Sequence, residues 1–143
     1  MNFQSELAPE IAAIIFPPPR TIAVLGLSDR PGRPSLEVAE ALLRWGYDVV
    51  PVNPAVPSIL GRPAFATLGQ IQRAIDVVDV FRRSECVREH LPDILIARPR
   101  LLWLQDGVRD DFVAAAARAE GIQVVQNDCL ARRISGLRAG LGS

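Results

Sequence analysis

The chain contains no lysine, because all 16 of its basic residues are arginines. This absence excludes mechanisms that need a lysine amine, such as Schiff-base formation or the phosphate-binding lysine of a Walker A loop. The arginines are balanced by 16 acidic residues, so the formal net charge is zero. No overall field attracts the chain to nucleic acid or to an anionic membrane, and we expect neither as a partner. Any anion that the chain binds must be held by a local site.

Cysteine and histidine are also scarce. Cys86, Cys129 and His90 are the only such residues in the sequence, which is too few for a disulfide framework and lacks the spacing of a zinc site. An all-oxygen magnesium site stays open. The N-terminal segment lacks a basic region, and its run IAAIIF is too short for a signal core or a membrane span. We therefore expect a cytoplasmic protein in a reducing compartment.

Short aliphatic runs alternate with segments of helical spacing. The runs cover residues 21–27, 48–54, 75–81, 100–105 and 122–127 and have the near-continuous apolar character of buried parallel strands. The helical segments cover residues 36–43, 68–75, 87–95 and 112–119. The alternation predicts a single α/β domain of the Rossmann-like type, a doubly wound parallel five-stranded sheet with flanking helices. Ligands bind at the carboxyl ends of the strands in such a sheet.

The ends of the chain lie outside this alternation. Residues 1–20 predict a flanking helix, with Phe3, Leu7, Ile11 and Ile14 at helical spacing, followed by a Pro-rich connector. Residues 21–135 form the predicted binding domain, and residues 136–143 are expected to be a loose C-terminal tail.

The turn after the first predicted strand, GLSDRPGRPS at residues 26–35, has the character of a phosphate-binding turn. Small residues allow a ligand to approach the backbone, and the helix that follows offers unpaired N–H groups and a partial positive charge. We expect Ser35 to cap this helix, which would begin at Leu36. Arg30 and Arg33 add two cations beside the same helix end.

The same turn departs from the dinucleotide fingerprint G-x-G-x-x-G. Ser28 and Pro31 stand where the second and third glycines belong, and Asn53 ends the second strand where an acidic residue would bind a ribose diol. These departures disfavour NAD(P) and FAD, which are kept as alternative ligands.

Six motifs along the chain resemble the small stand-alone CoA-binding proteins, whose fold is also that of the CoA-binding domain of the succinyl-CoA synthetase α subunit. In order they are IAVLGLSDRPGRPS, GYDVVPVNP, LGRPAFATL, IDVVDVFRR, LLWLQDGV and GIQVVQNDC, and they span about residues 20–130. The resemblance implies that the chain binds coenzyme A or an acyl-CoA at the carboxyl edge of the sheet, without chemistry of its own. Ligase activity in the larger enzymes needs a phosphorylated histidine and a nucleotide-grasping partner, both outside the matched region.

The resemblance also implies a set of CoA-binding residues. The turn after the first strand would wrap the phosphates, the segment after the second strand would lie against the nucleotide, and the ends of the third and fourth strands would complete the site. The residues at these positions are Gly26, Leu27, Ser28, Asp29, Arg30, Arg33, Pro34, Ser35, Asn53, Pro54, Phe81, Arg82, Gln105, Gly107 and Val108. For Phe81, core packing and ligand contact are equally consistent with the pattern.

No group of residues predicts catalysis. Carboxylates near the expected strand ends lack a basic or nucleophilic companion that would form an acid–base pair or a triad. They are Asp29, Asp79, Asp106 and Asp128. His90 lies midway along a helical segment and is expected at the surface.

Cys129 supplies the alternative from another functional class. Relatives often have Asp-Arg-Cys where this chain has Asn127-Asp128-Cys129, so the arginine's role does not carry over, whereas the cysteine matches. The alternative is an enzyme or redox protein that acts on the CoA thiol or thioester through Cys129. A protein partner, a homo-oligomer and the identity of any acyl group stay open.

Overall fold

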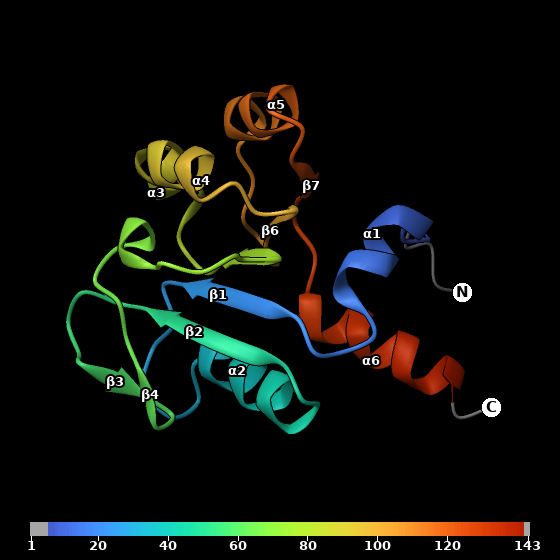
Figure 1. Cartoon of the computed structure of the whole chain (residues 1–143), viewed down its shortest axis with the longest axis horizontal. Helices are drawn as coiled ribbons and strands as arrows, with labels where there is room; N and C mark the ends of the chain where they lie inside the picture. The colour runs from blue at the N-terminus through green and yellow to red at the C-terminus, as the bar shows by residue number, and fades with distance from the viewer. Residues whose placement is uncertain (1–5, 142–143) are drawn as a thin grey trace.

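Five parallel strands form one sheet in the computed structural model, which describes residues 6–141 (Figure 1). The strand order is β2-β1-β5-β6-β7. Their bounds are β1 Thr21–Leu25, β2 Asp48–Val52, β5 Val77–Val80, β6 Leu101–Leu104 and β7 Gln123–Val125. Each lies inside a segment predicted from its apolar run, so the predicted strands are confirmed, with shorter ends.

Each face of the sheet buries its own core. Ile22, Val24 and Trp103 belong to one cluster, whereas Ala23 and Val78 belong to the other. Successive side chains of a strand point to opposite faces, so a strand covered on both faces must be apolar at every position. This explains why the strands appear in the sequence as continuous apolar runs.

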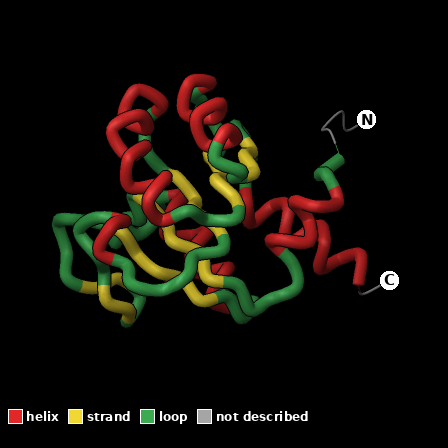
Figure 2. Tube along the Cα trace, turned by 45° about the horizontal axis from the view of Figure 1, so that its top comes forward, coloured by secondary structure: helices red, strands yellow, loops and turns green. Residues whose placement is uncertain are grey.

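Six α-helices cover the two faces in the described residues (Figures 1 and 2). On one face lie α1 Pro9–Ile15, α2 Pro34–Arg44 and α6 Leu130–Leu141, and on the other lie α3 Ser84–Val87, α4 Leu91–Ala97 and α5 Asp111–Ala119. The short 3-10 turns are η1 Leu68–Gln70 and η2 Arg88–His90. The predicted Rossmann-like, doubly wound α/β architecture is therefore confirmed.

The connection from β2 to β5 differs from the prediction. The helix expected over residues 68–75 is wrong, since only η1 forms there. The chain first makes an antiparallel hairpin, β3 Ser58–Ile59 and β4 Arg62–Pro63. It is then held extended beside β2, because Phe65 N donates to Pro51 O (2.9 Å) and Asn53 N donates to Phe65 O (2.8 Å). Leu68 and Ile75 are buried as separate anchors rather than as one helical stripe.

The predicted loose tail is also wrong for the residues that the structure describes there, because α6 continues to Leu141. Leu130 and Ile134 of this helix are fully buried, and Leu137 packs against the same core. Within residues 6–141, no helix combines the length and the apolar character that crossing a membrane requires.

Candidate functional site

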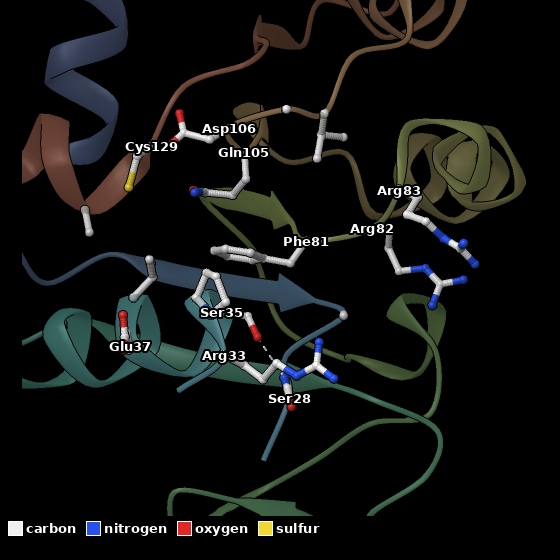
Figure 3. Close-up of a pocket in the computed structure, with 16 residues that line it drawn as sticks. Ser28, Arg33, Ser35, Glu37, Phe81, Arg82, Arg83, Gln105, Asp106 and Cys129 are labelled. Atoms are coloured by element: carbon white, nitrogen blue, oxygen red, sulfur yellow. Dashed lines mark hydrogen bonds between the residues drawn. The ribbon is translucent and has the colours of Figure 1, made fainter. Parts of the chain in front are cut away.

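Two clefts open at the carboxyl edge of the sheet. The α2–α6 cleft has a volume of about 750 Å³ and is lined by Gly26, Ser28, Arg33, Pro34, Ser35, Glu37, Val38, Phe81, Arg82, Arg83, Gln105, Asp106, Gly107, Val108, Cys129 and Ala131 (Figure 3). The β2 cleft has a volume of about 880 Å³ and is lined by Leu25, Gly26, Leu27, Ser28, Asp29, Arg30, Pro31, Val52, Asn53, Pro54, Ala55, Val56, Ala66, Arg82, Glu89 and His90. Gly26, Ser28 and Arg82 line both clefts, so the two meet at the turn between β1 and α2.

Every residue that the resemblance singled out lines one of these clefts. In the α2–α6 cleft are Gly26, Ser28, Arg33, Pro34, Ser35, Phe81, Arg82, Gln105, Gly107 and Val108, and in the β2 cleft are Gly26, Leu27, Ser28, Asp29, Arg30, Asn53, Pro54 and Arg82. The fold therefore gathers segments from four strand ends into one continuous surface.

Gly26 is required at the end of β1 by a close backbone approach. Its φ is +85°, and a Cβ at this position would lie 2.5 Å from the carbonyl oxygen of Phe81. Its N–H donates to Val52 O (3.0 Å). Gly26 thus brings the ends of β1, β2 and β5 together, and no larger residue fits there.

Two serines shape the rest of the turn. Ser28 N donates to Ser35 Oγ (3.0 Å), and Arg30 N donates to Ser28 Oγ (3.1 Å). The prediction that Ser35 caps α2 is wrong: the helix begins at Pro34, Arg33 is its N-cap, and no side chain caps it. Proline is favoured at the first helical position, which moves the helix start ahead of Ser35. Among the described residues no side chain accepts from the first turn of α2; Pro34 has no N–H, and Leu36 N donates to Arg33 O (3.1 Å) instead.

Arg30 and Arg33 lie on different sides of this turn. Arg33 borders the α2–α6 cleft and Arg30 the β2 cleft. In the part of the chain that the structure describes, neither guanidinium has a carboxylate, carbonyl or ring partner, and Arg44 is the only other arginine in that condition. Two of the three unpaired guanidiniums thus flank the capless start of α2.

Arg82 links the clefts and is only partly paired. Its Nη2 lies 3.0 Å from Glu89 Oε1, while its buried Nε has no acceptor among residues 6–141. His90 was expected at the surface, but it is half-buried and lines the β2 cleft. Burial and the charge of Arg82 lower the pKa of His90 below its ordinary value.

The loop after β6 is fixed by side-chain hydrogen bonds. Gln105 is buried, and its Oε1 accepts from Leu130 N (3.1 Å) at the start of α6. Gly107 N donates to Asn127 Oδ1 (2.8 Å), and Asn127 N donates to Val108 O (3.2 Å). Asn127 has a φ of +54°, a conformation that asparagine adopts more readily than most residues. The rim of the α2–α6 cleft is therefore preformed.

Asn53 is committed to the protein's own backbone. Its Nδ2 donates to Leu27 O (2.9 Å), and its Oδ1 accepts from Ala55 N (2.7 Å). Both polar atoms of the amide are thus engaged at the place where a dinucleotide fold would present a carboxylate to a ribose diol.

Residues that sequence reasoning missed complete both clefts. In the α2–α6 cleft they include Glu37, Val38, Arg83, Asp106 and Ala131. Glu37 and Val38 lie three and four residues after Pro34, so helical spacing from a predicted residue was a usable signal. In the β2 cleft the missed side chains include Val56, Ala66 and Glu89, which the unpredicted course of the β2–β5 connection and η2 bring there.

Asp79 does not belong to the site. The sequence placed it near a strand end, but it lies within β5, between Val24 and Trp103 on the neighbouring strands. It is fully buried, and neither carboxylate oxygen has a hydrogen-bond partner in the described chain. Burial raises its pKa well above the ordinary value. Asp79 lines neither cleft.

Comparisons with known proteins bear on this site. Residues 20–134 match a family described as CoA binding domain. The uncharacterized protein YneT of Bacillus subtilis (strain 168) is 36% identical over 111 residues, which cover 78% of this chain and 82% of YneT. The structure of cell-free ID.343 from Thermus thermophilus superposes with a TM-score of 0.85 at 38% identity, over 90% of this chain and 96% of that one.

A larger protein shares the fold alone. The dinucleotide-forming acetyl-coenzyme A synthetase 1 of Ca. Korarchaeum cryptofilum, in complex with phosphate and ADP, has a TM-score of 0.66 at 20% identity. The match covers 76% of this chain and 26% of the synthetase chain.

Proposed function

Since the chain belongs to the family of CoA binding domains, we propose that it binds coenzyme A or an acyl-CoA across its two clefts. The observation that carries the proposal is the junction of these clefts at the β1–α2 turn, where two unpaired arginines, one bordering each cleft, flank a helix start without a side-chain cap. A helix N-terminus with adjacent guanidiniums favours a phosphate group. Coenzyme A has its diphosphate between a 3′-phosphorylated nucleoside and a long pantetheine arm, which matches one cationic junction between two clefts.

The proposed ligand lies with its diphosphate at the turn. The nucleotide occupies the β2 cleft beside Asn53 and Pro54, as the resemblance implies for these positions. The pantetheine arm follows the α2–α6 cleft, passing the half-buried ring of Phe81 toward the loop at Gln105. Clefts of roughly 300–1,000 Å³ suit small-molecule ligands, and each of the two falls in that range.

Binding without catalysis is the form of the proposal that the titratable residues support. Cys129 lines one cleft and His90 the other, so these two side chains do not form a nucleophile–base pair. The carboxylate of Asp106 is held in a salt bridge by Arg132 (2.9 Å), whose hydrogen bond keeps the pKa of Asp106 below its ordinary value. Such a carboxylate is a poor general base.

The direct test is calorimetry or native mass spectrometry with four ligands. We expect coenzyme A and acetyl-CoA to bind, dephospho-CoA to bind more weakly because it lacks one phosphate, and NAD to show no saturable binding. Asn53 supports the last expectation, because its engaged amide replaces the carboxylate that would receive a ribose diol. Tight binding of NAD without any response to coenzyme A would overturn the proposal.

A second candidate function rests on the position of Cys129. This half-buried thiol lines the cleft assigned to the pantetheine arm. Its thiolate would attack one sulfur of CoA disulfide, form a protein–CoA mixed disulfide and release the other half as CoA thiolate. Cys86 lies on α3 and lines neither cleft, which makes it the matched control. After incubation with CoA disulfide, Cys86→Ser should gain the mass of one CoA and Cys129→Ser should not. An unmodified Cys86→Ser variant would exclude the role of Cys129, and equal modification of both variants would mean that the cleft gives Cys129 no special reactivity.

A further inference from the structure

Side chains of opposite charge lie toward the two ends of the α2–α6 cleft (Figure 3). Arg33, Arg82 and Arg83 gather toward one end, near the β1–α2 turn. Glu37 and Cys129 lie toward the other end, on opposite walls formed by α2 and by the start of α6. A ligand that places phosphates at the arginines therefore extends its other end toward Glu37.

Glu37 is the carboxylate lining this cleft that forms no ion pair in the described residues. Asp106 receives two hydrogen bonds from Arg132 (3.1 and 2.9 Å). Asp128, at the base of the same region, is paired with Arg132 (3.1 Å) and Arg133 (2.8 Å). Glu37 is exposed and has no cation partner in the part of the chain that the structure describes.

From this arrangement we infer that the cleft discriminates among acyl-CoA thioesters by charge and accepts uncharged acyl groups while disfavouring acyl groups that carry a carboxylate. The inference rests on the proposed binding of coenzyme A and assigns Glu37 as the specificity-determining residue. The thioester of the bound molecule lies between Glu37 and Cys129. The negative charge of Glu37 repels an acyl group that carries a carboxylate, whereas it does not repel a neutral acyl group.

The repulsion is large enough to measure. Like charges about 4 Å apart interact by an amount equivalent to roughly fivefold in affinity even in bulk water, and by more where protein walls exclude solvent. Because Glu37 is exposed, added salt reduces the effect. We therefore expect a preference of about fivefold to fiftyfold at low salt, declining as salt is added.

Propionyl-CoA and malonyl-CoA form a matched pair of probes, because a methyl group in the first is replaced by a carboxylate in the second. Calorimetric titration of the whole protein should show the weaker binding for malonyl-CoA. The variant Glu37→Gln should bring the two affinities together chiefly by strengthening malonyl-CoA. Glu40→Gln is the matched control: Glu40 lies on the same helix, is also exposed and without an ion pair among residues 6–141, and does not line the cleft.

The outcomes separate this inference from the proposed function. If wild-type protein binds both thioesters equally well, or if Glu37→Gln leaves the ratio unchanged, the role of Glu37 is wrong although coenzyme A binding stands. If Glu40→Gln changes the ratio as much as Glu37→Gln does, the effect comes from overall charge and the assignment to the cleft is also wrong. If no CoA compound binds wild-type protein, the proposed function itself fails.

Discussion

Arg30 and Arg33 are three residues apart in the chain, yet they border different clefts. This separation allows each guanidinium to be tested with a different fragment of coenzyme A. In the proposed orientation, Arg33 faces the pantetheine side of the diphosphate and Arg30 the nucleotide side. A charge-assisted hydrogen bond contributes about 1.5 to 3 kcal/mol, which is roughly a tenfold to hundredfold change in affinity.

We therefore expect Arg33→Ala to weaken coenzyme A and 4′-phosphopantetheine by these factors and to leave unphosphorylated pantetheine nearly unaffected. Arg30→Ala should weaken adenosine 3′,5′-bisphosphate more than 4′-phosphopantetheine. Arg44→Ala is the control, because Arg44 is likewise unpaired in the described chain but lies at the far end of α2. Calorimetry with each fragment measures the changes. Equal losses for pantetheine and phosphopantetheine would argue against a phosphate contact at Arg33.

Asp79 gives a prediction about stability rather than binding. Burial raises the pKa of its carboxyl well above 3.8, so the folded chain keeps this group protonated while the unfolded chain ionises it. A group with a raised folded pKa contributes stability that is present below the unfolded pKa and is lost as pH rises toward the folded pKa. Asp79 should thus reduce the free energy of unfolding by up to about 1.4 kcal/mol for each pH unit above about 4 in that window.

Asp79→Asn removes the titration while keeping the side chain's shape. The difference in unfolding free energy between this variant and wild type should shift in the variant's favour from about pH 5 to about pH 7. Urea unfolding at each pH measures it, and taking the difference cancels the opposite trend from Asp106 and Asp110, whose arginine partners lower their pKa values. If the free energy of unfolding of the two proteins changes with pH in parallel, burial does not raise the pKa of Asp79.

At the scale of elements, the strands were predicted most accurately, because one physical requirement determines their sequence. Strands buried on both faces need continuous apolar residues, and every predicted strand formed. The helix predicted in the β2–β5 connection was wrong because Leu68 and Ile75 are each buried without lying on one helix face. The chain just before them is held extended by backbone hydrogen bonds such as that from Phe65 N to Pro51 O. A few apolar residues at helical spacing cannot distinguish these two outcomes.

The prediction of a loose tail over residues 136–143 was wrong as far as Leu141, for a different reason. Leu130, Ile134 and Leu137 have helical spacing, but Gly136 lowers helix propensity in this segment. Tertiary contacts overcome that cost: Trp103 Nε1 donates to Asp128 O (2.9 Å) just before the helix, and buried residues follow. Helix propensity is a property of the local sequence, so it could not predict a helix that these tertiary contacts stabilise.

Removal of residues 136–143 tests the packing of α6. The deletion removes Leu137 from the core edge and Arg138, whose guanidinium lies 4.9 Å from the centre of the Trp45 ring. We expect a loss of about 2 kcal/mol in the free energy of unfolding, or roughly 5 °C in melting temperature.

The variant Arg138→Ala separates the two contributions to that loss. It removes the ring contact alone and should cost about 0.5 to 1 kcal/mol. Urea unfolding of the deletion, the point variant and wild type provides the comparison. A deletion as stable as wild type would mean that the end of α6 contributes nothing to the fold.

At the scale of the whole molecule, the location of the site followed from topology. Parallel strands bring their carboxyl ends to one edge, so the loops after β1, β2, β5 and β6 could be predicted to meet. Side chains such as Glu37 and Glu89 could not be assigned in this way, because their places in the clefts depend on how α2 and η2 are positioned over that edge. The sequence thus determined which loops converge, and the packing of the helices determined which further side chains join them.

The same convergence predicts that coenzyme A stabilises the folded chain as a unit. A ligand that contacts the ends of four strands binds the folded state only, and at about 100 times its dissociation constant it adds roughly 2.7 kcal/mol to the free energy of unfolding. For a chain of this size the melting temperature should rise by about 5 to 10 °C.

Because the proposed phosphate contacts are exposed arginines, the dissociation constant for coenzyme A should increase with salt concentration, and the rise in melting temperature at a fixed concentration of ligand should decrease. Thermal unfolding with and without coenzyme A at two salt concentrations measures both effects. A shift that salt leaves unchanged, or that the double variant Arg30→Ala/Arg33→Ala retains in full, would mean that the β1–α2 turn does not hold the phosphates.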